Sequence, residues 1–136
     1  MAVLARADGA ALAALAGDLA ATPHQLLRPP ETGMVMVRGR TGGSGAPFNL
    51  GEATVTRCTA QLGCGSLGHA YVLGRDGDKA ALAALLDALL QTDAHDQVAA
   101  RVIEPLAAGQ EARNAARQSA AAATKVDFFT MVRGDG

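Results

Sequence analysis

The chain has 136 residues, twelve basic and thirteen acidic side chains that leave a net charge of -1, and a hydrophobic fraction of 49%. This length suits one domain, so residues 1–136 are expected to fold as a single unit. The interspersed charges argue against the clustered basic surface of a nucleic-acid-binding protein. Alanine dominates the hydrophobic fraction and buries little area, so we expect a thin core that a partner surface completes.

The cysteines and the N-terminal stretch exclude further classes. Cys58 and Cys64 lack CxxC spacing and have no suitably spaced histidine, so we expect reduced thiols and no metal site. The Ala- and Leu-rich N-terminal stretch is interrupted by Arg6, Asp8 and Asp18, which argues against a signal peptide or a membrane span. We therefore expect a cytoplasmic protein with no membrane partner.

The first 22 residues predict a helical segment. Asp8 has the side chain of an N-cap, and leucines recur on one face of a helix expected over 9–20.

Residues 24–74 predict an antiparallel meander of three to four strands. Pro29 and Pro30 deny a helix to an extended piece, and Gly33 is expected to open a turn after it. Alternating small, β-branched and polar residues then predict strands over 34–40, 52–62 and 67–74.

Residues 76–124 predict two to three helices. The first carries leucines at i, i+3, i+4, i+7 and i+8, and Asp76 or Asp78 is expected to cap it rather than leave its N-terminus open to an anion. A second helix is expected over 94–103, ending before Pro105. A third, over 107–124, is almost all alanine, and we expect it to be solvated or packed against another backbone. The fold class predicted is α+β.

The segment RTGGSG joins two predicted strands and allows two interpretations. Glycine-rich backbone can present N–H groups to a phosphate, and an arginine in the next strand could face the same loop. The segment lacks a following Lys-Ser/Thr pair and a helix, so a plain turn with one or more glycines at positive φ is the alternative. The candidate phosphate-contacting residues are Thr41, Gly42, Gly43, Ser44, Gly45 and Arg57.

No group of residues predicts a catalytic site. Glu31, Glu52, Asp87 and Asp127 are scattered, and no nucleophile stands beside a base. We therefore assign no catalytic residue, no metal ligand and no cofactor to this chain.

The C-terminal residues 125–136 form the last predicted segment. The chain has only three Phe and one Tyr, yet two of the Phe are adjacent here. We expect a docking tail, because an extended segment would point neighbouring aromatics in opposite directions, one toward the parent domain and one toward a partner. The alternative is that both fold back onto the thin core. The candidate partner-binding residues are Lys125, Asp127, Phe128, Phe129, Met131, Val132 and Arg133.

Five segments, in order and with matching spacing, resemble the PhnG family, the G subunit of the bacterial carbon–phosphorus lyase system. The closing VDFFTMVRGD is the most specific of them, and the N-terminal helix matches only in character. The segments are ETG at 31–33, RTGGSGAPFNLGEATVTR at 40–57, LGHAYVLGRD at 67–76, LLDAL at 85–89 and KVDFFTMVRGD at 125–135.

The resemblance implies a role in phosphonate catabolism within a hetero-oligomer containing H, I and J subunits, the I subunit being the expected direct contact. It implies that the assembly replaces the adenine of ATP with an alkylphosphonate, giving ribose 1-methylphosphonate 5-triphosphate when the phosphonate is methylphosphonate. It also implies that the nucleosidase-like chemistry belongs to the I subunit and the iron–sulfur chemistry to the J subunit. This chain would then be an accessory, non-catalytic subunit.

Two alternatives remain from the residues alone. One is a free-standing phosphate-ester enzyme that uses Arg57 and the glycine-rich loop. The other is a plain oligomeric scaffold without a link to substrate.

Overall fold

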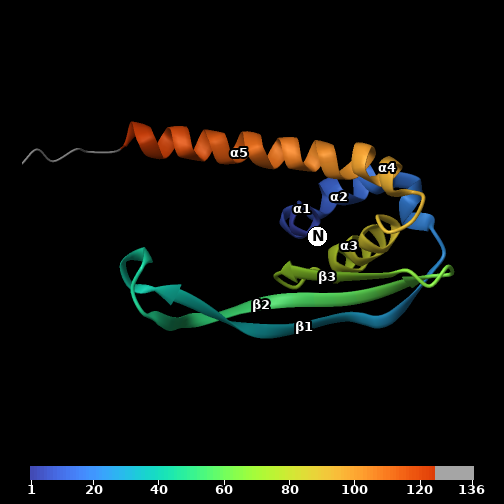
Figure 1. The fold of residues 1–136 in the computed structure, drawn as a ribbon, viewed down its shortest axis with the longest axis horizontal. Helices are drawn as coiled ribbons and strands as arrows, with labels where there is room; N and C mark the ends of the chain where they lie inside the picture. The colour runs from blue at the N-terminus through green and yellow to red at the C-terminus, as the bar shows by residue number, and fades with distance from the viewer. Residues whose placement is uncertain (125–136) are drawn as a thin grey trace, which may run out of the picture.

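A computed structural model of the chain describes residues 1–124 and is built on a three-stranded antiparallel sheet in the order β1-β2-β3 (Figure 1). β1 spans His24–Arg40, β2 spans Pro47–Leu62 and β3 spans Leu67–Leu73. β1 pairs with β2 from His24 opposite Leu62 to Arg40 opposite Pro47. The predicted α+β class is confirmed, with helices before and after an antiparallel meander.

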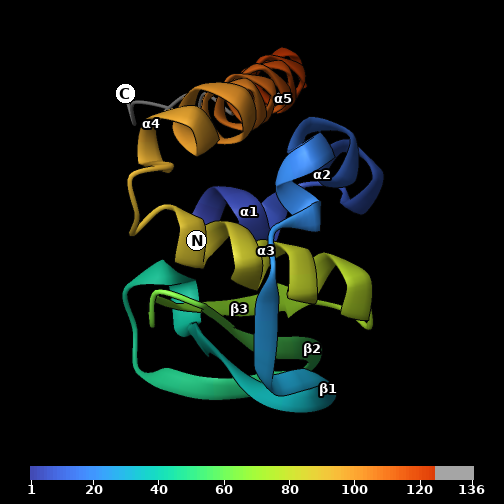
Figure 2. The same cartoon turned by 90° about the vertical axis from the view of Figure 1, so that its right-hand side faces the viewer.

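Helices cover one face of the sheet in successive layers (Figure 2). The long helix α3 lies directly on the sheet, the N-terminal helices lie beyond α3, and the C-terminal helices form the outermost layer. None of the helices within residues 1–124 combines the length and hydropathy needed to cross a bilayer. The helical elements are α1 (Ala2–Arg6), α2 (Gly9–Ala16), η1 (Gly17–Ala21), η2 (Thr41–Gly43), α3 (Gly77–Leu89), α4 (His95–Val98), η3 (Ala99–Ile103) and α5 (Glu104–Ala123).

The core lies between the sheet and these helices and combines leucines with an equal number of alanines. Eight of its twenty buried residues are alanine, and Phe48 and Tyr71 lie outside it at 45% and 50% exposure. Small residues allow α3 to approach the sheet closely, since a Cβ on Gly68 would overlap backbone atoms of Ala84 and Ala88. At Gly68 the sheet and α3 are therefore in close backbone contact.

β1 is one continuous strand, so the predicted turn at Gly33 is wrong. Gly33 pairs with Val55, and the ladder shifts register between Arg28 and Glu31. The two prolines fall within that shift, on an edge strand, where a residue without an N–H is tolerated. The prolines thus coincide with a shift in register but do not end the strand.

The helix boundaries differ from the predicted ones at both ends of the chain. The N-terminal helix stops at Ala16, and the chain continues as the tighter turn η1, which a 2.6 Å ion pair between Asp18 and Arg101 holds against η3. Near the C-terminus the helix does not end before Pro105. The wide π-turn η3 leads directly into α5, and Pro105 lies in the first turn of α5, where its missing N–H is tolerated.

Two parts of the structure extend beyond the helical layers toward the same end of the molecule (Figure 1). One is the second half of α5, where every side chain from residue 111 to 124 is exposed. The other is the β1–β2 ribbon of residues 34–54, which continues past the last β3 pairing, Val55 opposite Leu73. We call residues 34–54 the hairpin arm.

Candidate functional site

The glycine-rich loop forms the tip of the hairpin arm. Gly42 and Gly43 have φ values of 58° and 83°, which confirms the expectation of positive φ in this loop. The backbone N–H groups of Ser44 and Gly45 both donate to the carbonyl oxygen of Thr41, at 2.8 Å for Gly45. These two amides are therefore already used inside the turn, and phosphate binding by the loop stays a prediction.

Arg57 lies far from this loop. It is in the middle of β2, between Glu31 on β1 and Tyr71 on β3, while the loop meets β2 at Pro47. With a rise of about 3.3 Å per residue, ten residues of strand separate Arg57 from the loop by roughly 30 Å. The structure does not bring the two halves of the candidate phosphate site together.

Arg57 instead belongs to a cluster of charges on the face of the sheet that lacks helices. Its Nε and Nη2 atoms both lie 3.2 Å from Glu31 Oε2, and Arg28 Nε approaches the same oxygen at 3.9 Å. The three side chains are about half exposed, so the ion pairs contribute little to stability. Two guanidinium groups share one carboxylate, which leaves one net positive charge.

An open depression of about 350 Å³ adjoins this cluster, lined in part by Glu31, Arg57 and Tyr71. Sequence reasoning singled out Arg57 but missed Arg28 and Tyr71 as its neighbours. Only the pairing of the strands shows that these residues are neighbours. It places Glu31 opposite Arg57, 26 positions later in the chain, which local spacing does not indicate. The guanidinium of Arg57 in this depression can bind an anion, although Glu31 competes for the same N–H groups.

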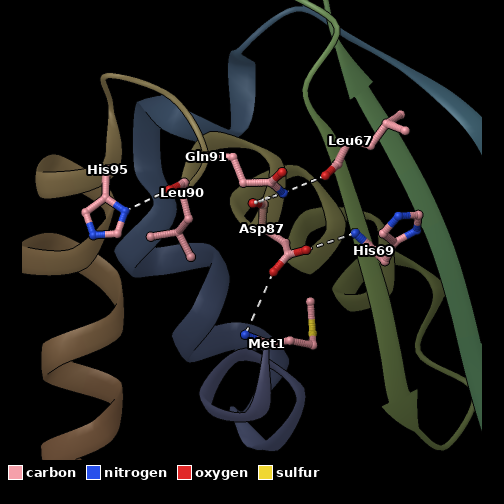
Figure 3. Close-up of polar contacts among 7 residues, drawn as sticks. All are labelled: Met1, Leu67, His69, Asp87, Leu90, Gln91 and His95. Atoms are coloured by element: carbon pink, nitrogen blue, oxygen red, sulfur yellow. Dashed lines mark hydrogen bonds and ion pairs between the residues drawn. The ribbon is translucent and has the colours of Figure 1, made fainter.

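Asp87 has a structural role within α3. Figure 3 shows its carboxylate accepting a hydrogen bond from the backbone N–H of His69 at 3.0 Å and facing the Met1 ammonium group at 3.8 Å. One turn later Gln91 Nε2 donates to the Leu67 carbonyl oxygen at 2.6 Å. These contacts fasten α3 to β3 and occupy the carboxylate.

Asp76 and Asp8 are likewise occupied, as helix caps. Asp76 Oδ1 accepts from the backbone N–H of Lys79 at 2.9 Å, and Asp8 Oδ1 accepts from that of Ala11 at 3.1 Å. The capping interpretation of both residues is confirmed. A second aspartate, Asp78, lies in the first turn of α3 and adds negative charge where an anionic ligand would have to bind.

The two cysteines are free thiols in different environments. Cys58 is buried and donates to the carbonyl oxygen of Arg28 at 3.2 Å, and burial raises the pKa of its thiol. Cys64 is exposed, and its hydrogen bond to Ser66 lowers its pKa. Within residues 1–124, no three His, Cys, Asp or Glu side chains gather as a metal site would require.

The candidate partner-binding residues of the C-terminal tail, from Lys125 to Arg133, lie outside the described residues. Their docking role stays a prediction.

Comparison with known proteins identifies the relatives of this chain. A family model described as phosphonate metabolism protein PhnG matches residues 1–134. The alpha-D-ribose 1-methylphosphonate 5-triphosphate synthase subunit PhnG of Rhizobium meliloti (strain 1021) is 52% identical over 109 residues. That alignment covers 80% of this chain and 70% of the relative.

Proposed function

The chain belongs to the PhnG family, and from this premise we propose that it is the small subunit of a ribose 1-methylphosphonate 5-triphosphate synthase in organic phosphonate catabolism. The observation that carries this proposal is the 52% identity to a protein named as that subunit. The assembly would transfer an alkylphosphonate onto the ribose of ATP and release adenine, as the family resemblance implies. We place it in the cytoplasm, where ATP is available.

We further propose that this subunit is not catalytic and contributes no cofactor ligands. The carboxylates of Asp8, Asp76 and Asp87 support this division, because all are engaged in helix caps or in fastening α3 to the sheet. Glu31 is engaged by Arg57. A general acid or base needs a carboxylate free to reach substrate, and none of these four is free. We assign catalysis to another subunit, as the family resemblance implies.

The proposed partners are the H, I and J subunits, with the I subunit in direct contact. The test is co-expression of this chain with the three subunits, co-purification, and measurement of adenine released from ATP plus methylphosphonate. Omitting this chain should abolish assembly and adenine release together. Adenine release by the isolated chain, or stoichiometric metal bound to it, would contradict the accessory role.

The C-terminal tail is proposed to dock on a partner subunit. Burying one Phe side chain contributes roughly 1.5–3 kcal/mol, enough to matter where few residues dominate an interface. Two variants test the tail: truncation after Thr124, and Phe128→Ala combined with Phe129→Ala. Both should remain folded and lose their partners. A fall in the thermal stability of the isolated chain would instead favour packing of the tail onto its own core.

A further inference from the structure

The hairpin arm carries apolar side chains on both of its faces. Met34 pairs with Thr54, two residues from the buried Thr56, so Met34 and Met36 lie on the face that α3 covers farther along the sheet. Val35 and Val37 alternate with them and lie on the opposite face. A strand that is apolar on both faces is typical of one buried between two layers.

Neither face of the arm is covered by the described part of the chain. On one face Met34 is 69% exposed and Met36 is 53% exposed. On the other Val37 is 36% exposed and Val35 is half-buried, and no helix lies over the arm (Figure 1). Large apolar side chains gathered in this way indicate an interaction site, because soluble proteins rarely leave them together in water. A two-stranded ribbon without a third strand or a helix is also only marginally stable by itself.

We propose that the hairpin arm inserts into a partner subunit of the assembly, which covers both faces of the ribbon with apolar side chains and presents acidic groups to its tip. This inference rests on the proposed function, since it requires a hetero-oligomer. It adds the segment of this chain that makes the contact and the chemistry of the surface that receives it.

The distribution of charge supports an acidic partner. The arm contains Arg38 and Arg40 toward its tip against Glu52, which pairs with Met36 nearer its base. Residues 111–124 of α5, which project toward the same end of the molecule, contain two arginines against one glutamate (Figure 1). These two projecting parts therefore carry a charge of +2, although the whole chain carries -1. A second copy of the chain would bring like charges together, whereas an acidic partner would be attracted.

The experiment uses the full chain co-expressed with the H, I and J subunits. Met36→Glu places a charge on one face of the arm and Val37→Glu places one on the other. The control is Leu27→Glu, since Leu27 is 51% exposed on β1 outside the arm. Each arm variant should lower the amount of co-purified partner by about tenfold, as expected for a charge buried without a counterion in an interface. The control should assemble like the unsubstituted chain.

A charge reversal near the tip of the arm tests whether the partner subunit presents acidic groups there. Arg38→Glu should slow association and weaken its dependence on salt, because it replaces an attractive positive charge with a repulsive negative one. The isolated variants should unfold at the same temperature as the unsubstituted chain, since these side chains lie in solvent before assembly.

The outcomes separate the inference from the proposed function. Failure of the unsubstituted chain to co-purify with any of the three subunits overturns the proposed function. Normal assembly of both arm variants overturns the inference alone. The inference is also overturned if the isolated chain is a dimer that Met36→Glu dissociates, because the arm would then bind a second copy of the chain. It is likewise overturned if the arm amides are protected from hydrogen exchange in the isolated chain and lose this protection on truncation after Thr124, because the C-terminal tail would then cover the arm.

Discussion

β1 and β2 run from a half of the sheet that carries a helix into a half that does not, and their side chains change where the helix ends. Under α3 the inward side chains of β2 are small and buried, as at Cys58 and Ala60. Beyond α3 the inward side chains of β1 are Met34 and Met36, and both are largely exposed. β1 thus presents large apolar side chains beyond the end of α3, where the proposed partner subunit would cover them.

The largest expected effect comes from removing core volume in the covered half. Leu86 is fully buried, so Leu86→Ala should cost about 2–5 kcal/mol in the free energy of unfolding. Met36→Ala in the arm should change it by less than about 0.5 kcal/mol in the isolated chain. Urea unfolding followed by circular dichroism measures both. Equal losses would show that the isolated chain already buries the arm.

A smaller effect is expected from adding one methyl group to the backbone. Gly68→Ala should cost about 1–3 kcal/mol, because the new Cβ would push α3 away from β3. Gly51→Ala is the matched substitution in the arm, where a Cβ meets no atom within 4 Å. Its free energy of unfolding should stay within about 0.5 kcal/mol of the original value. If Gly68→Ala also leaves the free energy of unfolding unchanged, α3 does not approach the sheet as closely as the structure indicates.

The N-cap of α3 and the turn at the tip of the arm should contribute similar free energies, but disrupting the cap should destabilise the whole fold and disrupting the turn should destabilise only the arm. Asp76→Ala should lower the free energy of global unfolding by about 1 kcal/mol, because it removes the N-cap of α3. Gly43→Ala adds strain of about 1 kcal/mol at a positive φ, yet it should open only the arm. Hydrogen exchange of arm amides should rise in Gly43→Ala while amides of α3 keep their protection. Faster exchange throughout the molecule would contradict the separation of the two regions.

The smallest effect concerns the surface pair between Asp18 and Arg101. The hydrogen bond from Arg101 lowers the pKa of Asp18, so the pair stabilises the fold above the pKa of the unfolded chain. This contribution is lost as the pH falls through the lowered pKa of the folded state. Asp18→Asn should therefore be less stable than the unsubstituted chain at pH 7, with the difference vanishing in strong acid. Arg101→Gln is the matched variant, and combining the two should add no further loss.

The local sequence pattern was sufficient to predict the helices, caps and strands that depend on residues close together in the chain. The leucine spacing and Asp76 predicted α3 with its cap, and Asp8 predicted the start of α2. Alternation predicted β2 and β3 to within a few residues over their covered parts. In each case the physical cause acts over one helical turn or one strand repeat.

The candidate site was less predictable because its parts are far apart in the chain. Arg57 could be chosen as a cationic residue inside a strand, but its partner Glu31 is set by the register between β1 and β2. The same register separates Arg57 from the glycine-rich loop, contrary to the expectation that the two could face each other.

The sequence by itself determined the α+β class, the meander, the capped α3 helix and, through its quoted segments, the PhnG family, because these follow from short-range periodicity and ordered motifs. Only the tertiary structure decided that β1 passes through its two prolines, that η3 joins the last helices, and that the hairpin arm has no layer on either face. The reason is that burial of a strand depends on which other element packs against it. The alternation that predicts a strand is the same whether or not a helix packs on it.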